Sequence, residues 1–353
     1  MGNGGIENLP EFDDHELVTF LSDKGSGLKS FVVIHNTNLG PSVGGTRYWN
    51  YGSEEEALRD GLRLSRAMTY KCALAGVPFG GGKAVIIASN HNPKKKEILG
   101  AYAKRVNIFK GNFSTGEDVG IDQNDVDFMY RYSRFIIGRT AGDLGIWTAW
   151  GLYYAVLPAL EAVYGNGDAR GRTFAVKGIG KVGGSFVEII RKKGARVIVA
   201  DIDKEKIRKL RKKYPDIETV SPKEIHKQRV DVYAPCALGG EFSKKTIPQL
   251  RCAIICGGAN NQLALKEDGG RLHSWGVLYV PDYLANAGGL INVVAELDKS
   301  GYSRRRVIRK IKGVRSTARK IIRLSLEKNK ATSEVADRLA ESIFKSKNTV
   351  KYH

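Results

Sequence analysis

The stretch that decides the fold is RTFAVKGIGKVGGSFVEIIRKKGARVIVADID, residues 172–203. An apolar run at its start is followed by a glycine-rich turn, an amphipathic segment with helical spacing, and a second apolar run that ends at Asp201. Strand, tight turn, helix and strand in this order make one βαβ unit. Apolar runs and helical segments keep alternating through the C-terminal half, which predicts a parallel, doubly wound sheet.

The glycines of this turn match a dinucleotide-binding pattern. Gly178, Gly180 and Gly183 have the spacing G-x-G-x-x-G, directly after a predicted strand and at the start of a predicted helix. The first glycine permits the tight turn, the second lets the backbone approach a pyrophosphate, and the third lets helix and strand pack closely. Asp201 would bind both ribose hydroxyls and repel a 2′-phosphate, which favours NAD over NADP, although two lysines close behind it weaken this preference. A Rossmann-like domain that binds another ligand stays open as an alternative.

The N-terminal half has the pattern of a separate α/β domain. Two apolar runs predict strands, and three segments have helical periodicity, the first of them with Ser53 as its N-cap. The predicted strands are 28–37 and 84–88, and the predicted helices are 53–71, 97–110 and 122–133. We expect an α/β domain over 1–140 and a Rossmann dinucleotide-binding domain over 141–320, with the helices of about 320–353 packed back on the first domain.

Composition excludes several classes of protein. The chain has 353 residues, of which 42% are hydrophobic and 27% charged, which is ordinary for a globular protein with a sizeable core. It contains no apolar run long enough to cross a bilayer, and its acidic N-terminus does not read as a signal peptide. The four cysteines have no zinc-binding spacing, so we expect no metal and a reduced, cytoplasmic protein.

The net charge of +20 raises the question of an anionic partner. The densest basic run, residues 304–323, has ten basic residues and no acidic one, and its apolar residues recur at helical spacing. This pattern predicts a helix with one face in the core and a solvated basic face. No nucleic-acid reading motif accompanies the charge, which argues against a nucleic-acid partner.

A second glycine-rich stretch, GVPFGGGKAVII at residues 76–87, has Lys83 directly after three glycines. A phosphate loop is excluded, because Val77 stands where that motif needs glycine and Ala84 where it needs Ser or Thr. Lys71 and Asp118 are the other charged candidates of this half. A lysine shielded from water and close to another cation loses its proton readily and can act as a base. Composition and spacing alone leave each of the three open as a surface charge or an ion pair.

Eight stretches together carry a resemblance to a known family. They are NTNLGPSVGGTRYW, LRLSRAMTYKCA, GVPFGGGKAVII, STGEDVG, GIGKVG, APCALGG, GGANNQL and PDYLANAGGLINV. In this order they resemble the Glu/Leu/Phe/Val dehydrogenase family. The resemblance implies two domains with the active cleft between them, of which the first, 1–140, is the substrate-binding, catalytic and oligomerisation domain. It implies NAD-dependent oxidative deamination of an L-amino acid to a 2-oxo acid and ammonia. It also implies a homo-oligomer, from dimer to octamer.

The same resemblance assigns roles to residues. Lys71 looks like the lysine that pairs with the substrate carboxylate, Lys83 like the catalytic lysine that activates water, and Asp118 like its proton partner. Further residues look like part of the substrate site: Leu39, Gly44, Gly45, Gly116, Asn286 and Leu290. Beside the three glycines of the turn and Asp201, the cofactor site would include Lys181, Val182, Thr148, Ala237, Asn260 and Asn286.

Two positions bear on the preferred amino acid. Gly116 and Leu290 resemble phenylalanine-type members, where a missing methyl would leave room for a ring, while other positions resemble leucine-type members. We therefore expect a large apolar L-amino acid, with phenylalanine slightly ahead. The segment 141–148 lacks the proline usual in the family, which puts the role of Thr148 in question. A biosynthetic relative acting on tryptophan-derived acids, and a nucleic-acid-associated protein on a dehydrogenase scaffold, stay open as alternatives.

Overall fold

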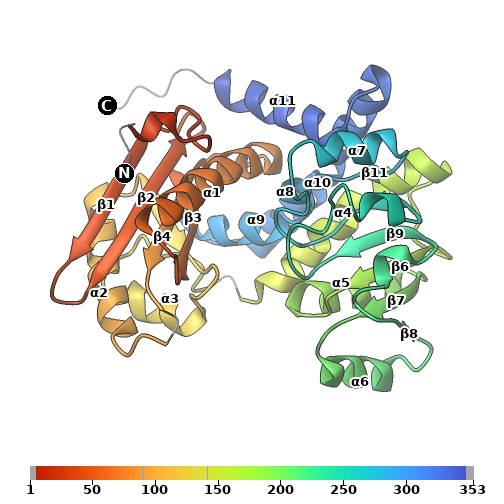
Figure 1. Ribbon diagram of the computed structural model, residues 1–353, viewed down its shortest axis with the longest axis horizontal. Helices are drawn as coiled ribbons and strands as arrows, with labels where there is room; N and C mark the ends of the chain where they lie inside the picture. The colour runs from red at the N-terminus through yellow and green to blue at the C-terminus, as the bar shows by residue number, and fades with distance from the viewer. Residues whose placement is uncertain (1–4, 90, 141, 347–353) are drawn as a thin grey trace. The chain divides into compact units, whose positions relative to one another are not determined.

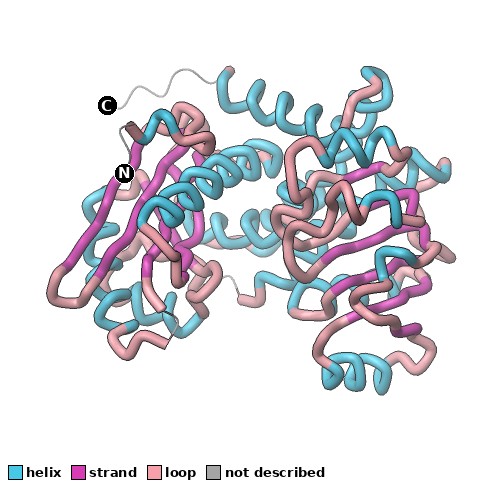
Figure 2. Tube along the Cα trace, in the orientation of Figure 1, coloured by secondary structure: helices cyan, strands magenta, loops and turns pink. Residues whose placement is uncertain are grey.

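The computed structural model describes residues 5–89, 91–140 and 142–346. The chain forms two compact units, shown as ribbon and tube in Figures 1 and 2. The first takes the described residues of 1–142, 293–302 and 340–353, and the second takes 143–292 and 303–339. The predicted two-domain α/β fold is confirmed. The predicted domain limits and the cleft between the domains stay predictions.

The first unit is built on a mixed sheet with the strand order β1-β2-β4-β3-β5. β1 and β2 pair antiparallel, as do β2 and β4, whereas β3 runs parallel to both β4 and β5. The strands are β1 (Leu17–Asp23), β2 (Leu28–Asn36), β3 (Ser42–Trp49), β4 (Gly80–Ile87) and β5 (Phe113–Gly116).

Helices cover both faces of this sheet, and the alternation of side chains along each strand decides which face a residue serves. On β2, Phe31 and Val33 pack with apolar residues of α1 (Glu54–Ala75), while Val32 and Ile34 belong to the core formed with α2 (Lys95–Val106) and α3 (Gln123–Tyr130). Figure 1 shows α1 lying along the strands of this sheet.

The ends of α1 have clear chemical causes. Ser53 caps its N-terminus by accepting a hydrogen bond from the Glu56 N–H, as predicted, but the Glu56 carboxylate accepts from the Gly52 N–H rather than completing a capping box with Ser53. The helix ends at Gly76, whose φ of 65° lies in the left-handed region that glycine adopts easily.

The strands of this unit differ from the sequence prediction in two ways. β4 begins at Gly80 rather than at residue 84, because its glycines pair with both β2 and β3 instead of forming a turn. β1, β3 and β5 lie outside the predicted strands. β1 is an edge strand that leaves Phe20 45% exposed, and β3 contains Gly44 and Gly45, so neither shows the continuous apolar run of a buried strand.

The second unit is built on six parallel strands in the order β11-β10-β9-β6-β7-β8. Taken from β6 as the first strand, this is the 3-2-1-4-5-6 order of a Rossmann fold, with the switch point between β6 and β9. The strands are β6 (Thr173–Lys177), β7 (Arg196–Ala200), β8 (Glu218–Thr219), β9 (Val230–Pro235), β10 (Cys252–Ile255) and β11 (Leu278–Tyr279). The parallel sheet predicted from residues 172–203 is confirmed.

From residue 144 onward the chain forms a further set of helices, of which the long apolar α4 (Leu144–Tyr164) and the long basic α10 (Arg304–Lys328) pack on each other. The others are α5 (Lys181–Lys192), α6 (Lys204–Lys213), α7 (Asp268–Ser274), α8 (Asp282–Ala285), α9 (Gly288–Val294) and α11 (Thr332–Lys345). On α10 the predicted apolar face is buried except for Ile308, which is 38% exposed. Among the described residues, no helix is long and apolar enough to span a membrane.

Candidate active site

Lys83 extends from β4 toward the face of the sheet that α1 covers, because it alternates with Ala84 and shares a face with Val85. Its side chain is only 6% exposed. The ammonium Nζ lies 2.9 Å from Oδ2 of Asp118, which stands in the loop after β5. Two of the residues predicted to act together therefore form a nearly buried ion pair within one unit.

Asp118 binds a second cation through the same oxygen. Arg47, on β3, donates from Nε to Asp118 Oδ2 over 3.0 Å. Burial by itself would raise the pKa of Asp118, but the charges of Lys83 and Arg47 outweigh it and hold that pKa at about 2. Asp118 is therefore a carboxylate at neutral pH.

The glycines before Lys83 are required by close approach of backbone. A Cβ on Gly81 would lie 2.1 Å from the backbone nitrogen of Thr69 on α1, and one on Gly80 would lie 2.1 Å from the Asn36 carbonyl oxygen. A Cβ on Gly82 would meet the Phe113 ring at 2.9 Å. Any larger residue at these positions would push the neighbouring backbone or ring away. The glycines therefore let α1 and the turn before β3 pack directly against the strand that carries Lys83.

Two glycines of β3 enclose the pair from the other side. A Cβ on Gly44 would lie 1.8 Å from the Gly82 carbonyl oxygen, and one on Gly45 would lie 2.6 Å from the Glu117 carbonyl oxygen and 2.8 Å from Cβ of Asp118. The structure thus brings Gly44, Gly45, Lys83 and Asp118 together. Gly45 lies directly against Asp118, and Gly44 lies against the residue before Lys83.

Lys71 and Leu39 lie on the segments that border these glycines. Lys71 is a partly buried residue of α1, two positions after the threonine that touches Gly81. Leu39 stands in the turn between β2 and β3 and is also partly buried. Both belong to the unit that holds the Lys83–Asp118 pair.

Gly116 has a packing role that the sequence did not reveal. A Cβ on this residue would lie 2.4 Å from the carbonyl oxygen of Ile137, and the segment that contains Ile137 is hydrogen-bonded to Thr115 over 2.8 Å. Glycine here lets that segment pack against β5. The missing methyl therefore has a structural cause in this chain, whatever it adds to a substrate pocket.

The glycine turn of the second unit forms a cradle at the switch point of the sheet. Gly178 has φ +88°, a left-handed conformation that glycine adopts without strain, and Gly183 packs so closely that its Cβ would lie 1.9 Å from the Gly178 carbonyl oxygen. A Cβ on Gly180 would meet nothing within 4 Å. Gly180 is the N-cap of α5 and provides no side-chain cap, so the N–H groups of that helix end face open space that suits a pyrophosphate.

Asp201 is tied to this turn. Its Oδ2 accepts a hydrogen bond from the backbone N–H of Ile179 over 2.7 Å, and its Oδ1 accepts from the N–H of Asp203 over 2.8 Å. Ala237, just past β9, lies against the turn at 2.9 Å from the position of a Cβ on Gly178. Lys181 and Val182 open α5 directly after the turn. All the predicted residues of this group lie around one loop.

The remaining predicted residues lie elsewhere in the second unit. Asn286 is 7% exposed, and its Nδ2 donates to Oδ1 of Asn260 over 2.8 Å. Its own Oδ1 is buried and has no partner among the described residues. Leu290 is a partly buried residue of α9. Thr148, one turn after the start of α4, donates its hydroxyl to the Leu144 carbonyl oxygen over 2.9 Å.

Part of the unusual segment 141–148 lies outside the described residues, namely Ala141. In the rest, Asp143 caps α4 by accepting from the Gly145 N–H over 2.8 Å. No group of three or more His, Cys, Asp or Glu side chains suited to a metal ion occurs in the described part of the chain.

Comparison with known proteins decides the family. The dimerisation domain of Glu/Leu/Phe/Val dehydrogenases matches residues 16–134, and the Glutamate/Leucine/Phenylalanine/Valine dehydrogenase domain matches residues 145–340. The chain belongs to the Glu/Leu/Phe/Val dehydrogenase family. The family expected from the eight sequence stretches is confirmed, and so is the prediction of an oxidoreductase of the amino-acid dehydrogenase class.

Individual relatives match over nearly the whole chain. Leucine dehydrogenase of Bacillus cereus is 40% identical over 95% of this chain and 92% of its own length. Phenylalanine dehydrogenase of Caldalkalibacillus thermarum is 40% identical over 94% and 91%. The crystal structure of L-tryptophan dehydrogenase from Nostoc punctiforme has a TM-score of 0.84 at 36% identity, covering 95% of this chain and 97% of that one. The family implies a nicotinamide cofactor, and the cradle around Gly180 suits one.

Two charged residues of this family member were not predicted. Arg47 touches Asp118, and Asp60 of α1 accepts from Arg47 over 2.9 Å. The side chains are 19% and 14% exposed. Arg47 lies within the quoted motif GGTRYW and two residues after Gly45, so strand alternation places it on the same face. The two-residue spacing between Gly45 and Arg47 indicates a shared face only if residues 42–49 form a strand, which the sequence pattern did not predict.

Proposed function

We propose that this protein catalyses the NAD-dependent oxidative deamination of a large apolar L-amino acid to its 2-oxo acid and ammonia, and the reverse amination. The observation that carries the proposal is the nearly buried Lys83–Asp118 pair, with 2.9 Å between Nζ and Oδ2. A base shielded from bulk water is what the reaction needs, and the same chain provides a dinucleotide cradle at Gly178, Gly180 and Gly183.

In this proposal the residues of the first unit bind the substrate and move protons. Lys71 pairs with the substrate carboxylate, and a bound nicotinamide cofactor would supply the acceptor for the hydride that Cα loses as the amine becomes an imine. Lys83, in its neutral form, removes a proton from the water that attacks the imine carbon, and then steadies the carbinolamine oxygen until ammonia leaves. Asp118, ionised at neutral pH, accepts and returns the proton. Gly44 and Gly45, which lie against Gly82 and Asp118, line the proposed substrate site with backbone.

The proposed cofactor residues hold NAD through two kinds of contact. The N–H groups at the start of α5 bind the pyrophosphate, and the remaining lone pairs of Asp201 accept the ribose hydroxyls. The unpartnered Oδ1 of Asn286 accepts from an amide or amine group of cofactor or substrate, with Asn260 fixing its orientation. Thr148 and Ala237 stay proposed neighbours of the cofactor.

The substrate class is proposed as leucine- or phenylalanine-type, with phenylalanine slightly ahead. The relatives named leucine dehydrogenase and phenylalanine dehydrogenase support the class without separating the two, since each is 40% identical to this chain. Tryptophan is the second candidate, because a tryptophan dehydrogenase structure has a TM-score of 0.84 with this chain.

A screen of NAD reduction over the twenty L-amino acids at alkaline pH tests the proposal. We expect turnover of L-Phe and L-Leu, with NADP giving much less. A leucine preference above tenfold in kcat/KM would contradict the phenylalanine assignment, and a preference for L-Trp would favour the second candidate. Lys83→Ala should abolish turnover. Lys95→Ala is the matched control, since Lys95 also pairs with an aspartate, Asp125, over 2.7 Å in the same unit, and it should keep activity.

Assembly and location complete the proposal. The first unit matches a domain described as a dimerisation domain, so we propose a homo-oligomer between dimer and octamer, which light scattering after size exclusion would measure. We also propose a cytoplasmic location, which the four free cysteines support.

A further inference from the structure

Arg47 is a second cation built into the Lys83–Asp118 pair. It stands on β3, on the sheet face that α1 covers, and its side chain is 19% exposed. Nε donates to Asp118 Oδ2 over 3.0 Å, and Lys83 Nζ reaches that same oxygen at 2.9 Å. The two cations therefore share one carboxylate oxygen.

The other arm of Arg47 is held by a polar network. Its NH1 donates to Oδ2 of Asp60 over 2.9 Å, and the Tyr51 hydroxyl donates to the same oxygen over 2.7 Å. Arg63 donates to the second Asp60 oxygen over 2.6 Å. Arg47 is thus fixed at both ends and cannot turn away from Asp118 without breaking a second ion pair.

This arrangement has a consequence for proton transfer. An ammonium beside one carboxylate keeps its proton firmly, because the opposite charge favours the charged form. A second cation on that carboxylate offsets part of this attraction. Before the proton leaves, Lys83, Arg47 and Asp118 together carry a net charge of +1. Asp60 acts in the opposite direction, because its negative charge offsets part of the charge of Arg47.

We propose that Arg47 is a positioning residue whose charge sets the pH at which the Lys83–Asp118 pair releases its proton. In this proposal the negative charge of Asp60 offsets part of the effect of Arg47. This inference rests on the proposed function, in which neutral Lys83 is the base. The ionisable groups that contact Asp60 besides Arg47 are Tyr51 and Arg63, and Glu117 precedes Asp118 in the chain.

The test is the pH profile of kcat/KM for oxidative deamination at saturating NAD. Activity should rise with pH as the pair loses its proton. In Arg47→Gln the midpoint of this rise should move upward by about one pH unit, and in Asp60→Asn it should move downward by roughly half a unit. Asn keeps the hydrogen bonds to Arg47 and Tyr51 while removing the charge, so a merely structural role would not predict opposite shifts.

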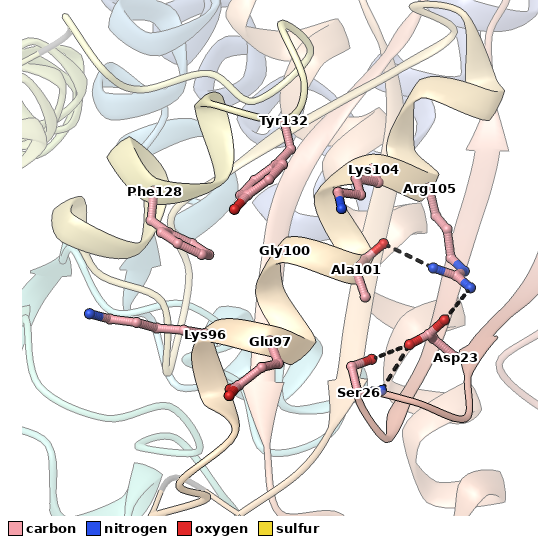
Figure 3. Close-up of a pocket in the computed structure, with 10 residues that line it drawn as sticks. All are labelled: Asp23, Ser26, Lys96, Glu97, Gly100, Ala101, Lys104, Arg105, Phe128 and Tyr132. Atoms are coloured by element: carbon pink, nitrogen blue, oxygen red, sulfur yellow. Dashed lines mark hydrogen bonds and ion pairs between the residues drawn. The ribbon is translucent and has the colours of Figure 1, made fainter.

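The matched control is Arg105→Gln. Arg105 also pairs with an aspartate, donating to Asp23 over 2.8 Å, but it stands on α2 at a pocket of about 470 Å³, drawn in Figure 3, which contains none of the predicted site residues. Arg105→Gln removes the same charge from the same unit and should leave the midpoint of the pH profile unchanged. Arg47→Lys, which keeps the charge without the two-armed geometry, should stay within about 0.3 unit of the wild type.

The outcomes separate the two proposals. If the wild-type protein reduces NAD with none of the L-amino acids, the proposed function is wrong, and if Lys83→Ala keeps turnover, the role proposed for Lys83 is wrong. If Lys83→Ala is inactive and the Arg47→Gln and Asp60→Asn midpoints both stay at the wild-type value, only the inference about Arg47 is wrong. Shifts of equal sign, or an Arg47→Lys midpoint that moves as far as that of Arg47→Gln, would also overturn it. Circular dichroism identifies a misfolded variant, and the Asp60→Asn shift then decides by itself.

Discussion

Asp201 Oδ2 accepts the backbone N–H of Ile179 over 2.7 Å, so the carboxylate that ends the second strand of the Rossmann unit also holds the glycine turn after the first. One side chain therefore has two tasks. It fixes the turn through an existing hydrogen bond, and in the proposed function it selects NAD through its charge.

Asp201→Asn should separate these two tasks. Asn keeps an oxygen acceptor for the Ile179 N–H, so the turn should stay intact, but the repulsion of a 2′-phosphate is lost. We expect the ratio of kcat/KM for NADP to that for NAD to rise about tenfold, since replacing a charged by a neutral hydrogen-bond acceptor is worth about 1.4 kcal/mol.

The control for Asp201→Asn is Asp203→Asn, which removes the same charge from the N-cap of α6. It should cost helix stability and leave the cofactor ratio unchanged. An unchanged ratio in Asp201→Asn would show that the charge of Asp201 does not select the cofactor.

Gly180→Ala should weaken cofactor binding, whereas Gly183→Ala should lower the stability of the fold. A Cβ on Gly180 meets nothing within 4 Å, so thermal stability should stay close to the wild type while KM for NAD rises, because the methyl occupies the cradle. A Cβ on Gly183 would lie 1.9 Å from the Gly178 carbonyl oxygen, so this variant should lose about 1–3 kcal/mol of unfolding free energy. Thermal melts with and without NAD, together with KM, distinguish the two. Equal effects of both variants on stability would contradict the cradle.

Gly116→Ala should lower stability. The added methyl would lie 2.4 Å from the Ile137 carbonyl oxygen, and the segment after it must shift, which should cost about 1–3 kcal/mol in urea denaturation. The preference between L-Phe and L-Leu is measured on the same protein. Full stability combined with a switch toward leucine would restore the interpretation of Gly116 as a pocket wall.

His35 should make stability depend on pH. Burial, assisted by the neighbouring His15, lowers the pKa of His35 to about 4, although Asp13 lies 3.5 Å from its Nε2. The unfolded pKa is about 6.5, so the unfolded chain binds the proton more readily. The stabilisation is fully present above pH 6.5 and is lost as pH falls from there toward 4.

Between pH 7 and pH 5 this should amount to about 2 kcal/mol of unfolding free energy. Urea denaturation at both pH values measures it, and His35→Gln should flatten the difference. The exposed His91 provides the control, because His91→Gln should leave the pH dependence as it is. A wild-type protein equally stable at pH 5 and pH 7 would contradict the assignment.

Much of the second unit could be predicted from residues 172–203 alone. The apolar runs there are buried on both faces, which makes them continuous, and the glycines stand at fixed offsets in a turn. The strands of the first unit were harder to predict, because β1 is an edge strand and the apolar pattern of β3 is interrupted by Gly44 and Gly45. Local pattern could not identify strands whose stability comes from pairing with neighbours distant in sequence.

By itself, the sequence determined the parallel Rossmann sheet, the glycine turn at Gly178 and the identity of the charged candidates, because each depends on residues close together in the chain. Only the tertiary structure decided that Lys83 and Arg47 meet on one oxygen of Asp118, and that Gly116 is required by the backbone of Ile137. Those contacts join strands and loops separated by tens of residues, and strand pairing rather than local propensity brings them together.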